Sequence, residues 1–215
     1  MTMNTRNAAL IAELSDELEP VRPMRAREGY AVLALAGAVT IGAVWMVAGL
    51  WDGVLTGTAS PFFVIINGLL LLVALAAIGA SIALASPHVG NRQDGPRWAL
   101  AMLGVMPIAA IAMMLGQGSG VASLIDPHAF TCFAAGSATS ALTFVALAWW
   151  LKRGAPVSTT LSGTIAGVAA GAAGSFAYGL SCPIDGLAHL GIWHVLPVVV
   201  CGALGRIALP RIIRW

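Results

Sequence analysis

The sequence predicts an all-α membrane protein with six transmembrane helices and a short amphipathic helix before the first of them, with both ends of the chain in the cytoplasm. Composition is the first observation, because 59% of the residues are apolar and only 9% are charged. A soluble domain carries about 25% charged residues. Most of the exterior of this chain is therefore expected to face lipid. Long apolar runs and a one-sided distribution of basic residues are the other two observations.

Six apolar runs are long enough to cross a bilayer. Each approaches the roughly 20 residues that a helix needs to span the hydrocarbon core. The third run is the shortest and contains Pro107, but it has no charged residue. The predicted spans are 30–50, 62–85, 98–116, 129–151, 161–180 and 188–209.

The basic residues predict the orientation. If the N-terminus is inside, all eleven Lys and Arg residues lie on the inner side, and the outer loops 51–61, 117–128 and 181–187 contain none. This distribution follows the rule that inner loops are enriched in Lys and Arg, and it requires an even number of spans. The sequence thus divides into a cytoplasmic segment 1–29, a membrane domain 30–209 and a cytoplasmic tail 210–215.

The N-terminal segment predicts a helix with one apolar stripe. Its apolar residues recur at i, i+1, i+4 and i+8, which places them on one face. A helix lying passively on the bilayer usually has a basic polar face. The polar face here is acidic, so docking on a protein partner is favoured over a passive tail. The stripe consists of Leu10, Ile11, Leu14 and Leu18.

Soft and titratable side chains gather on the predicted outer side. Cys132 and Cys182 are the central pair, and they leave three interpretations open. They can form a disulfide on a side of the membrane that is oxidising in bacteria, bind a soft ion such as Zn²⁺ or a heavy metal as thiolates, or pack as small buried apolar groups. The candidate additional ligands are His128, Asp185, His189 and His194.

Glycines recur at intervals of four in the fifth run, at Gly163, Gly167 and Gly171. On a helix this spacing forms one face of small residues, which allows a neighbouring backbone to approach closely. A substrate path or hinge is the alternative interpretation, and close helix packing is favoured.

Enzymes and transporters are disfavoured by what the spans lack. No charged residue lies at the centre of a predicted span, whereas proton-coupled transporters usually need buried carboxylates or His there. We expect no enzymatic activity. Two alternatives are kept: a small transporter or channel for a metal ion or lipid-like solute, and a thiol oxidoreductase facing the outer side.

Several short motifs, in order along nearly the whole chain, carry a resemblance to a known family. They are residues 10–14 with 18–22, the basic-Gly-Ala-Pro sequence 152–156, the glycine-rich run ending at Tyr178 before Cys182-Pro183, Trp193-His194, and the end 211–215. In this order and spacing the chain resembles the NrsF family of membrane-bound anti-sigma factors. Ser181 is a departure, because His precedes the second Cys in many members.

The resemblance implies a function in transcription regulation and stress response. Such proteins hold an extracytoplasmic-function sigma factor at the bacterial inner membrane and release it when heavy metal or another stress acts on two periplasm-facing cysteines, which match Cys132 and Cys182. The implied partners are the sigma factor and the lipid bilayer, with no direct contact to nucleic acid and no required cofactor. The apolar stripe is then expected to bind the sigma factor, and the basic residues Arg22, Arg25 and Arg27 to anchor the segment at the membrane surface.

Overall fold

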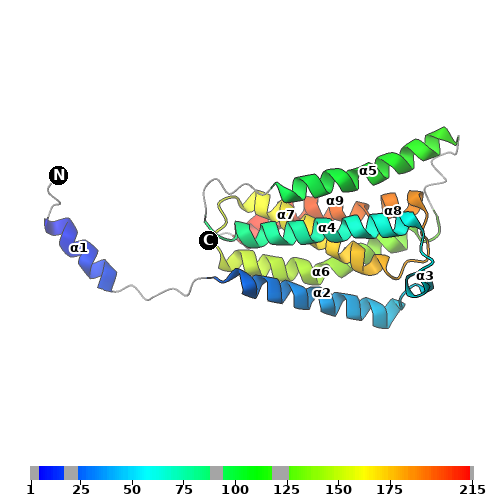
Figure 1. Cartoon of the computed structure of the whole chain (residues 1–215). Helices are drawn as coiled ribbons and strands as arrows, with labels where there is room; N and C mark the ends of the chain where they lie inside the picture. The colour runs from blue at the N-terminus through cyan, green and yellow to red at the C-terminus, as the bar shows by residue number, and fades with distance from the viewer. Residues whose placement is uncertain (1–4, 17–23, 88–93, 118–125, 214–215) are drawn as a thin grey trace.

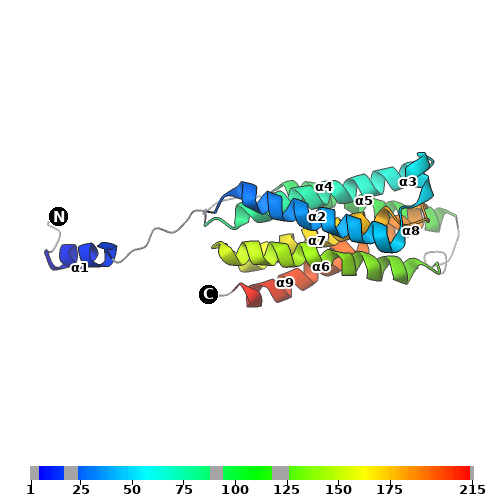
Figure 2. The ribbon, with the colours of Figure 1, turned by 90° about the horizontal axis from the view of Figure 1, so that it is seen from below.

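Helices make up all the regular secondary structure in the part of the chain that the computed structural model describes, residues 5–16, 24–87, 94–117 and 126–213. The long helices run along one another in a bundle, and short helices lie at one of its ends (Figures 1 and 2). The elements are α1 (Thr5–Asp16), α2 (Ala26–Ala48), α3 (Asp52–Thr56), α4 (Pro61–Leu84), α5 (Gly95–Gly116), α6 (Ala129–Arg153), α7 (Thr159–Gly179), α8 (Leu187–Trp193) and α9 (Leu196–Ile212).

Local sequence explains where several helices begin. The Ser60 hydroxyl accepts a hydrogen bond from the Phe63 N–H, and Pro61 follows it in the first turn of α4. Ser158 caps α7 in the same way, through the Leu161 N–H. Serine is a preferred N-cap residue and proline is tolerated in the first helical turn, so both starts follow known preferences.

The prediction of six membrane spans is corrected by the structure. Five described helical segments are long and apolar enough to cross a membrane: Ala26–Ala48, Pro61–Leu84, Gly95–Gly116, Ala129–Arg153 and Leu187–Ile212. The predicted span 161–180 corresponds to α7, which is a helix of sufficient length but is not among the five. Its sequence contains many Gly, Ser and Thr residues in place of large apolar ones, which lowers its hydropathy.

The packing of α7 gives the physical reason for its composition. This helix lies against α9, α6 and α4 in the middle of the bundle, and fourteen of its 21 residues are buried. Its surface is covered by other helices and not by lipid, so it does not need large apolar side chains. Small residues are instead required for close approach of the neighbouring backbones.

The last predicted span, 188–209, contains a break. α8 ends at Trp193 and α9 begins at Leu196, with turn residues between them. Pro197 lies in the first turn of α9, where its ring would clash with the carbonyl of Trp193 if the helix were continuous. The proline therefore divides the segment in two and gives His194 a position outside both helices.

Candidate functional site

Two cysteines and two histidines form a buried cluster at one end of the bundle. One side-chain ligand atom from each of Cys132, Cys182, His189 and His194 lies within 4.8 Å of those of the other three. The two Sγ atoms are 3.6 Å apart, and Cys182 Sγ is 3.5 Å from His189 Nε2. All four residues are at most 5% exposed. The structure thus brings together four of the six side chains that the sequence suggested as sensing residues.

Cys132 is placed by the first turn of α6. Its backbone N–H donates to the His128 carbonyl at 2.9 Å, so the helical hydrogen bonds have already started at this residue. The side chain faces the interior of the bundle and is 3% exposed.

Cys182 is placed by the end of α7. The Cys182 N–H donates to the carbonyl of Gly179, and the Ser181 N–H donates to that of Tyr178, so the chain continues as a tight turn after the helix. Pro183 follows and cannot supply the N–H that another helical turn would need. The helix therefore ends beside the N-terminus of α6, where Cys132 lies.

The break between α8 and α9 positions His194. Its carbonyl accepts a hydrogen bond of 2.5 Å from the buried Ser175 hydroxyl of α7. The His194 ring lies 5.4 Å from the His189 ring, centroid to centroid, in an edge-on arrangement. The His194 Nε2 atom is buried and has no hydrogen-bond partner among the described residues. An unpartnered buried polar atom is costly, so this nitrogen is suited to a ligand.

Asp126 orients the other histidine. Its Oδ2 atom lies 2.6 Å from His189 Nδ1, while its Oδ1 accepts a hydrogen bond from the His128 N–H. A carboxylate on one ring nitrogen fixes which nitrogen carries the proton and directs the other nitrogen outward. Here the other nitrogen, Nε2, faces Cys182 Sγ.

The cluster favours negative charge on Cys182. The pKa of the Cys182 thiol lies well below its ordinary value, mainly because the Cys132 thiol donates a hydrogen bond to it. Burial acts in the opposite direction, and the two histidines lower the pKa further. Burial also acts to raise the pKa of Asp126, but its hydrogen bonds to His189 and to the His128 backbone bring it below the ordinary value. A thiolate is the form of cysteine that binds metals and reacts with oxidants.

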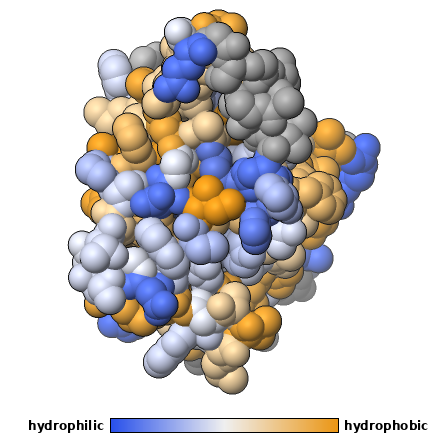
Figure 3. Space-filling view, turned by 90° about the vertical axis from the view of Figure 1, so that its right-hand side faces the viewer, coloured by the Kyte–Doolittle hydropathy of each residue, from blue (hydrophilic) through white to orange (hydrophobic). Residues whose placement is uncertain are grey.

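The end of the bundle above the cluster is polar. In Figure 3 hydrophilic residues gather around the middle of this face, with a hydrophobic group among them and more hydrophobic residues toward the rim. The described loops and short helices at this end contain Asp52, Asp126 and Asp185 and no Lys or Arg. The local charge therefore attracts cations.

The geometry fits a soft metal ion. Two thiolates bound to a tetrahedral Zn²⁺ at about 2.3 Å are separated by about 3.8 Å, and the two Sγ atoms are 3.6 Å apart. Two sulfur and two nitrogen donors form a common tetrahedral ligand set for zinc. The same sulfur atoms could also join as a disulfide after a movement of about 1.6 Å, since an S–S bond is about 2.0 Å long. Both cysteines are free thiols in this structure.

The two remaining sensing candidates lie outside the cluster. Asp185 accepts a hydrogen bond from the Ser60 N–H at 3.1 Å and thus binds the start of α4. His128 is exposed just before α6 begins. The third cysteine, Cys201, is half-buried in α9, where its backbone packs against α7.

The glycines of α7 lie against α9. A Cβ atom on Gly163 would come within 2.5 Å of the Gly205 carbonyl oxygen, and one on Gly171 within 2.6 Å of the Pro197 carbonyl oxygen. A Cβ on Gly167 would overlap the carbonyl oxygen of Cys201. Separations below 3.0 Å leave no room for a side chain, so the three positions allow direct contact between the two backbones.

The residues predicted to bind the partner lie on the exposed face of α1. Leu10, Ile11 and Leu14 are 54–55% exposed. Leu18 and Arg22 are outside the described residues. Arg25 and Arg27 are exposed at the start of α2.

Two contributors to the site had no role in the sequence analysis. Asp126 was not among the candidate residues, because nothing in the spacing links it to His189, 63 residues away. Gly179 leaves room beside the cluster, since a Cβ there would overlap Asn67 Oδ1 and lie 3.4 Å from His194 Nδ1. The Gly-x-x-Cys-Pro pattern of residues 179–183 is the sequence signal by which this glycine could be recognised.

The fold and the cluster together define a helical membrane protein with a buried Cys/His site at one end of its bundle. The family model described as NrsF, negative regulator of sigma F, matches residues 14–215. The chain belongs to the NrsF family, and the resemblance seen in the sequence is confirmed. The match begins at Leu14, so Leu10 and Ile11 precede it.

A curated relative supports the same assignment. It is a probable anti-sigma-F factor NrsF from Azospira oryzae and is 26% identical over 156 residues, which cover 72% of this chain and 73% of the relative. No solved structure matches the chain. The chain is thus a member of a family of negative regulators whose partner is a sigma factor.

Proposed function

We propose that this protein is an anti-sigma factor that holds an extracytoplasmic-function sigma factor at the bacterial inner membrane. It releases the sigma factor when a soft metal ion or an oxidant acts on Cys132 and Cys182. The observation that carries the sensing role is the buried cluster, in which four ligand atoms lie within 4.8 Å of one another. Family membership supports the regulatory role.

The distribution of charge supports a sidedness for this arrangement. Arg25 and Arg27 begin α2, Lys152 and Arg153 end α6, and Arg211 lies in the last turn of α9. These positions are at the end of the bundle opposite the cluster (Figures 1 and 2). The basic end is therefore assigned to the cytoplasm. α7 also runs from one end of the bundle to the other (Figure 1), so both termini are then cytoplasmic, and the cluster lies near the periplasm.

α1 is assigned to binding the sigma factor. Its apolar stripe is exposed at Leu10, Ile11 and Leu14, and an amphipathic helix with such a stripe suits an apolar groove on a partner. Glu13 and Asp16 flank the stripe and suit a groove with basic edges. Arg25, Arg27 and the neighbouring Arg22 are assigned to the anionic surface of the inner leaflet.

The signal is assigned to the four-residue cluster. Zn²⁺ or Cd²⁺ would be held by the sulfur atoms of Cys132 and Cys182 and by one nitrogen each of His189 and His194, a donor set that favours soft or borderline ions. An oxidant would act on the same sulfurs: the two thiols give up two electrons and two protons, the oxidant takes them, and an S–S bond forms. Metal binding and disulfide formation therefore exclude each other.

Metal-dependent release tests the proposal. The full-length protein in lipid nanodiscs, loaded with its sigma factor, is expected to release it when Cd²⁺ is added, with the ultraviolet absorption of Cd–thiolate bonds appearing in parallel. Cys132→Ser and Cys182→Ser are expected to hold the sigma factor but to lose both responses. Cys201→Ser is the matched control, because this cysteine lies outside the cluster, and it should behave as the unmodified protein. Release that is unchanged in both cluster variants would contradict the sensor assignment.

A further inference from the structure

α2 lies between the N-terminal segment, which the proposed function assigns to binding the sigma factor, and the end of the bundle that holds the cluster. It follows the N-terminal segment, and its C-terminal end lies beside the loop that contains Cys182. We propose that Leu180 and Ser181 couple the cluster to α2, and that α2 transmits the signal along the bundle to the N-terminal segment. This inference rests on the proposed function, because it assigns a route to the signal received at Cys182.

Two hydrogen bonds join the residues before Cys182 to the end of α2. The Ser181 hydroxyl donates to the carbonyl of Gly49, the C-cap of α2. The Trp51 N–H donates to the Leu180 carbonyl at 3.0 Å. These bonds lie one and two residues from Cys182, so a displacement of its sulfur acts on them directly.

The chain after α2 is held firmly at this point. The Trp51 ring packs on Phe63 of α4 with 5.2 Å between ring centroids. It also covers Gly53, where an added Cβ would lie 2.5 Å from the indole. The segment from Gly49 to Gly53 is therefore held in one position by packing, and it connects the Cys182 loop to α2.

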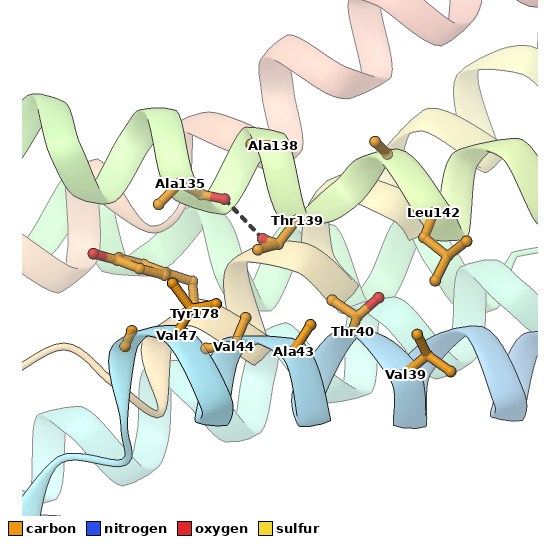
Figure 4. Close-up of a pocket in the computed structure, with 12 residues that line it drawn as sticks. Val39, Thr40, Ala43, Val44, Val47, Ala135, Ala138, Thr139, Leu142 and Tyr178 are labelled. Carbon is orange, nitrogen blue, oxygen red and sulfur yellow. Dashed lines mark hydrogen bonds between the residues drawn. The ribbon is translucent and has the colours of Figure 1, made fainter.

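α2 is held along one narrow face. Only five of its 23 residues are buried, along one stripe. Apolar grooves run beside it on both sides. One of about 450 Å³ lies between α2 and α6 with Tyr178 at its end (Figure 4). Another of about 460 Å³ lies on the α4 side and extends along α2 from Tyr30 to Ile41.

The other end of α2 has a tight contact that can serve as a pivot. Gly29 lies against Trp150 of α6, and a Cβ on this glycine would be 2.9 Å from the indole ring. α2 is thus in close contact with α6 at Gly29 and is joined to the Cys182 loop at Gly49, with open grooves beside the part between them. A tilt about Gly29 would carry the far end of the helix along with the Cys182 loop and would shift only the few buried residues of its stripe, such as Leu33 and Val44.

The direct alternative route, through α9, is disfavoured. His194 lies next to this helix, but α9 contacts α7 backbone to backbone at the glycines Gly163, Gly167 and Gly171. Displacing α9 would open this interface, and close-packed interiors resist such movement. When the cluster rearranges around a metal ion, α2 is therefore the helix that can follow.

Amide hydrogen exchange on the full-length protein in nanodiscs, with and without Cd²⁺, tests the coupling. Cd²⁺ is expected to change exchange in peptides covering both ends of α2. Ser181→Ala should bind Cd²⁺ as the unmodified protein does, by thiolate absorption. Its response in α2 should be about fivefold smaller, the effect of losing one average hydrogen bond.

Ser60→Ala is the matched control. The Ser60 hydroxyl donates to the Asp185 carbonyl and so binds the same loop, but it binds it to α4. This variant should keep the response in α2. A second pair is Gly53→Ala, which displaces the Trp51 ring and should weaken the response, and Gly42→Ala, which meets no atom within 4 Å and should not.

The outcomes separate the coupling from the proposed function. If Cd²⁺ binds and α2 does not respond, or if Ser181→Ala responds fully, the coupling is wrong while the metal site stands. The same conclusion follows if Ser60→Ala loses the response as completely as Ser181→Ala does. If the unmodified protein does not bind Cd²⁺, the metal site and the coupling both fail.

Discussion

His189 Nδ1 lies 2.6 Å from Asp126 Oδ2, and this contact joins α8 to the turn before α6. The same carboxylate accepts a hydrogen bond from the His128 N–H, so it is held on one side by the backbone and on the other by the imidazole. The second nitrogen of His189 is thereby directed at Cys182. Asp126 thus holds His189 as an outer carboxylate holds a metal-binding histidine, fixing the orientation of the ring and raising the basicity of the free nitrogen.

Replacing Asp126 should weaken metal binding. In Asp126→Asn the carboxylate charge that orients His189 is lost, and we expect Cd²⁺ affinity to fall about 10- to 100-fold, the usual effect of removing such an outer partner. Titration of the Cd–thiolate absorption measures this. Asp185→Asn is the control, because Asp185 binds the Ser60 N–H and not the cluster. Equal losses in both variants would indicate a general effect of charge at this end of the bundle.

Replacing His194 should also weaken metal binding, because its buried Nε2 has no partner among the described residues and is available to a ligand. His194→Ala is expected to lower Cd²⁺ affinity by at least tenfold. His128→Ala, an exposed neighbour of the cluster, should leave it unchanged. The ¹¹³Cd chemical shift supplies a second measurement, since it distinguishes sulfur from nitrogen ligands. An unchanged shift in His194→Ala would exclude this residue from the metal's ligands.

Adding a methyl group at the α7–α9 interface should destabilise the bundle. A Cβ on Gly167 would overlap the Cys201 carbonyl oxygen, and overpacking of this kind costs about 1–3 kcal/mol. We expect Gly167→Ala to unfold several degrees lower in a thermal melt in detergent. Gly68→Ala in α4 is the control, because no atom lies within 4 Å of its added Cβ. If Gly167→Ala unfolded at the same temperature as the control, the α7–α9 interface would be able to accommodate the added methyl group without cost.

Shortening one side chain of the α1 stripe should weaken binding of the sigma factor. Leu14 is 55% exposed, and burying a leucine in an interface contributes about 2 kcal/mol, so Leu14→Ala is expected to raise the dissociation constant about 30-fold. Surface plasmon resonance with the full-length protein in nanodiscs measures this. Glu13→Ala changes the adjacent residue off the stripe and should have a much smaller effect. Unchanged affinity in Leu14→Ala would place the binding surface elsewhere.

The sequence allowed most of the helices to be predicted because apolar length is a strong signal. Each predicted span coincides with a helix within a few residues, apart from the division of the last one. The number of spans was predicted less well, because α7 has too few large apolar residues to cross a membrane on its own composition. Its burial inside the bundle depends on which helices surround it, and a single sequence does not contain that information.

The site was predicted in part. Cys132 and Cys182 stood out by residue type, and His189 and His194 by their position early in the last predicted span. The exclusion of Asp185 and His128 from the cluster depends on the turn after Cys182 and on the start of α6. The contribution of Asp126 depends on a contact across 63 residues. Ser181 differs from the family pattern in the sequence, and only the structure relates it to Gly49.

The low hydropathy of α7 has a consequence for biosynthesis. A helix rich in Gly, Ser and Thr gains little free energy by leaving the translocon for lipid alone. We expect α7 to be retained there until α6 and α9 are available to cover it. The small residues that bring its neighbours within backbone contact would thus also set the order in which the nascent chain assembles.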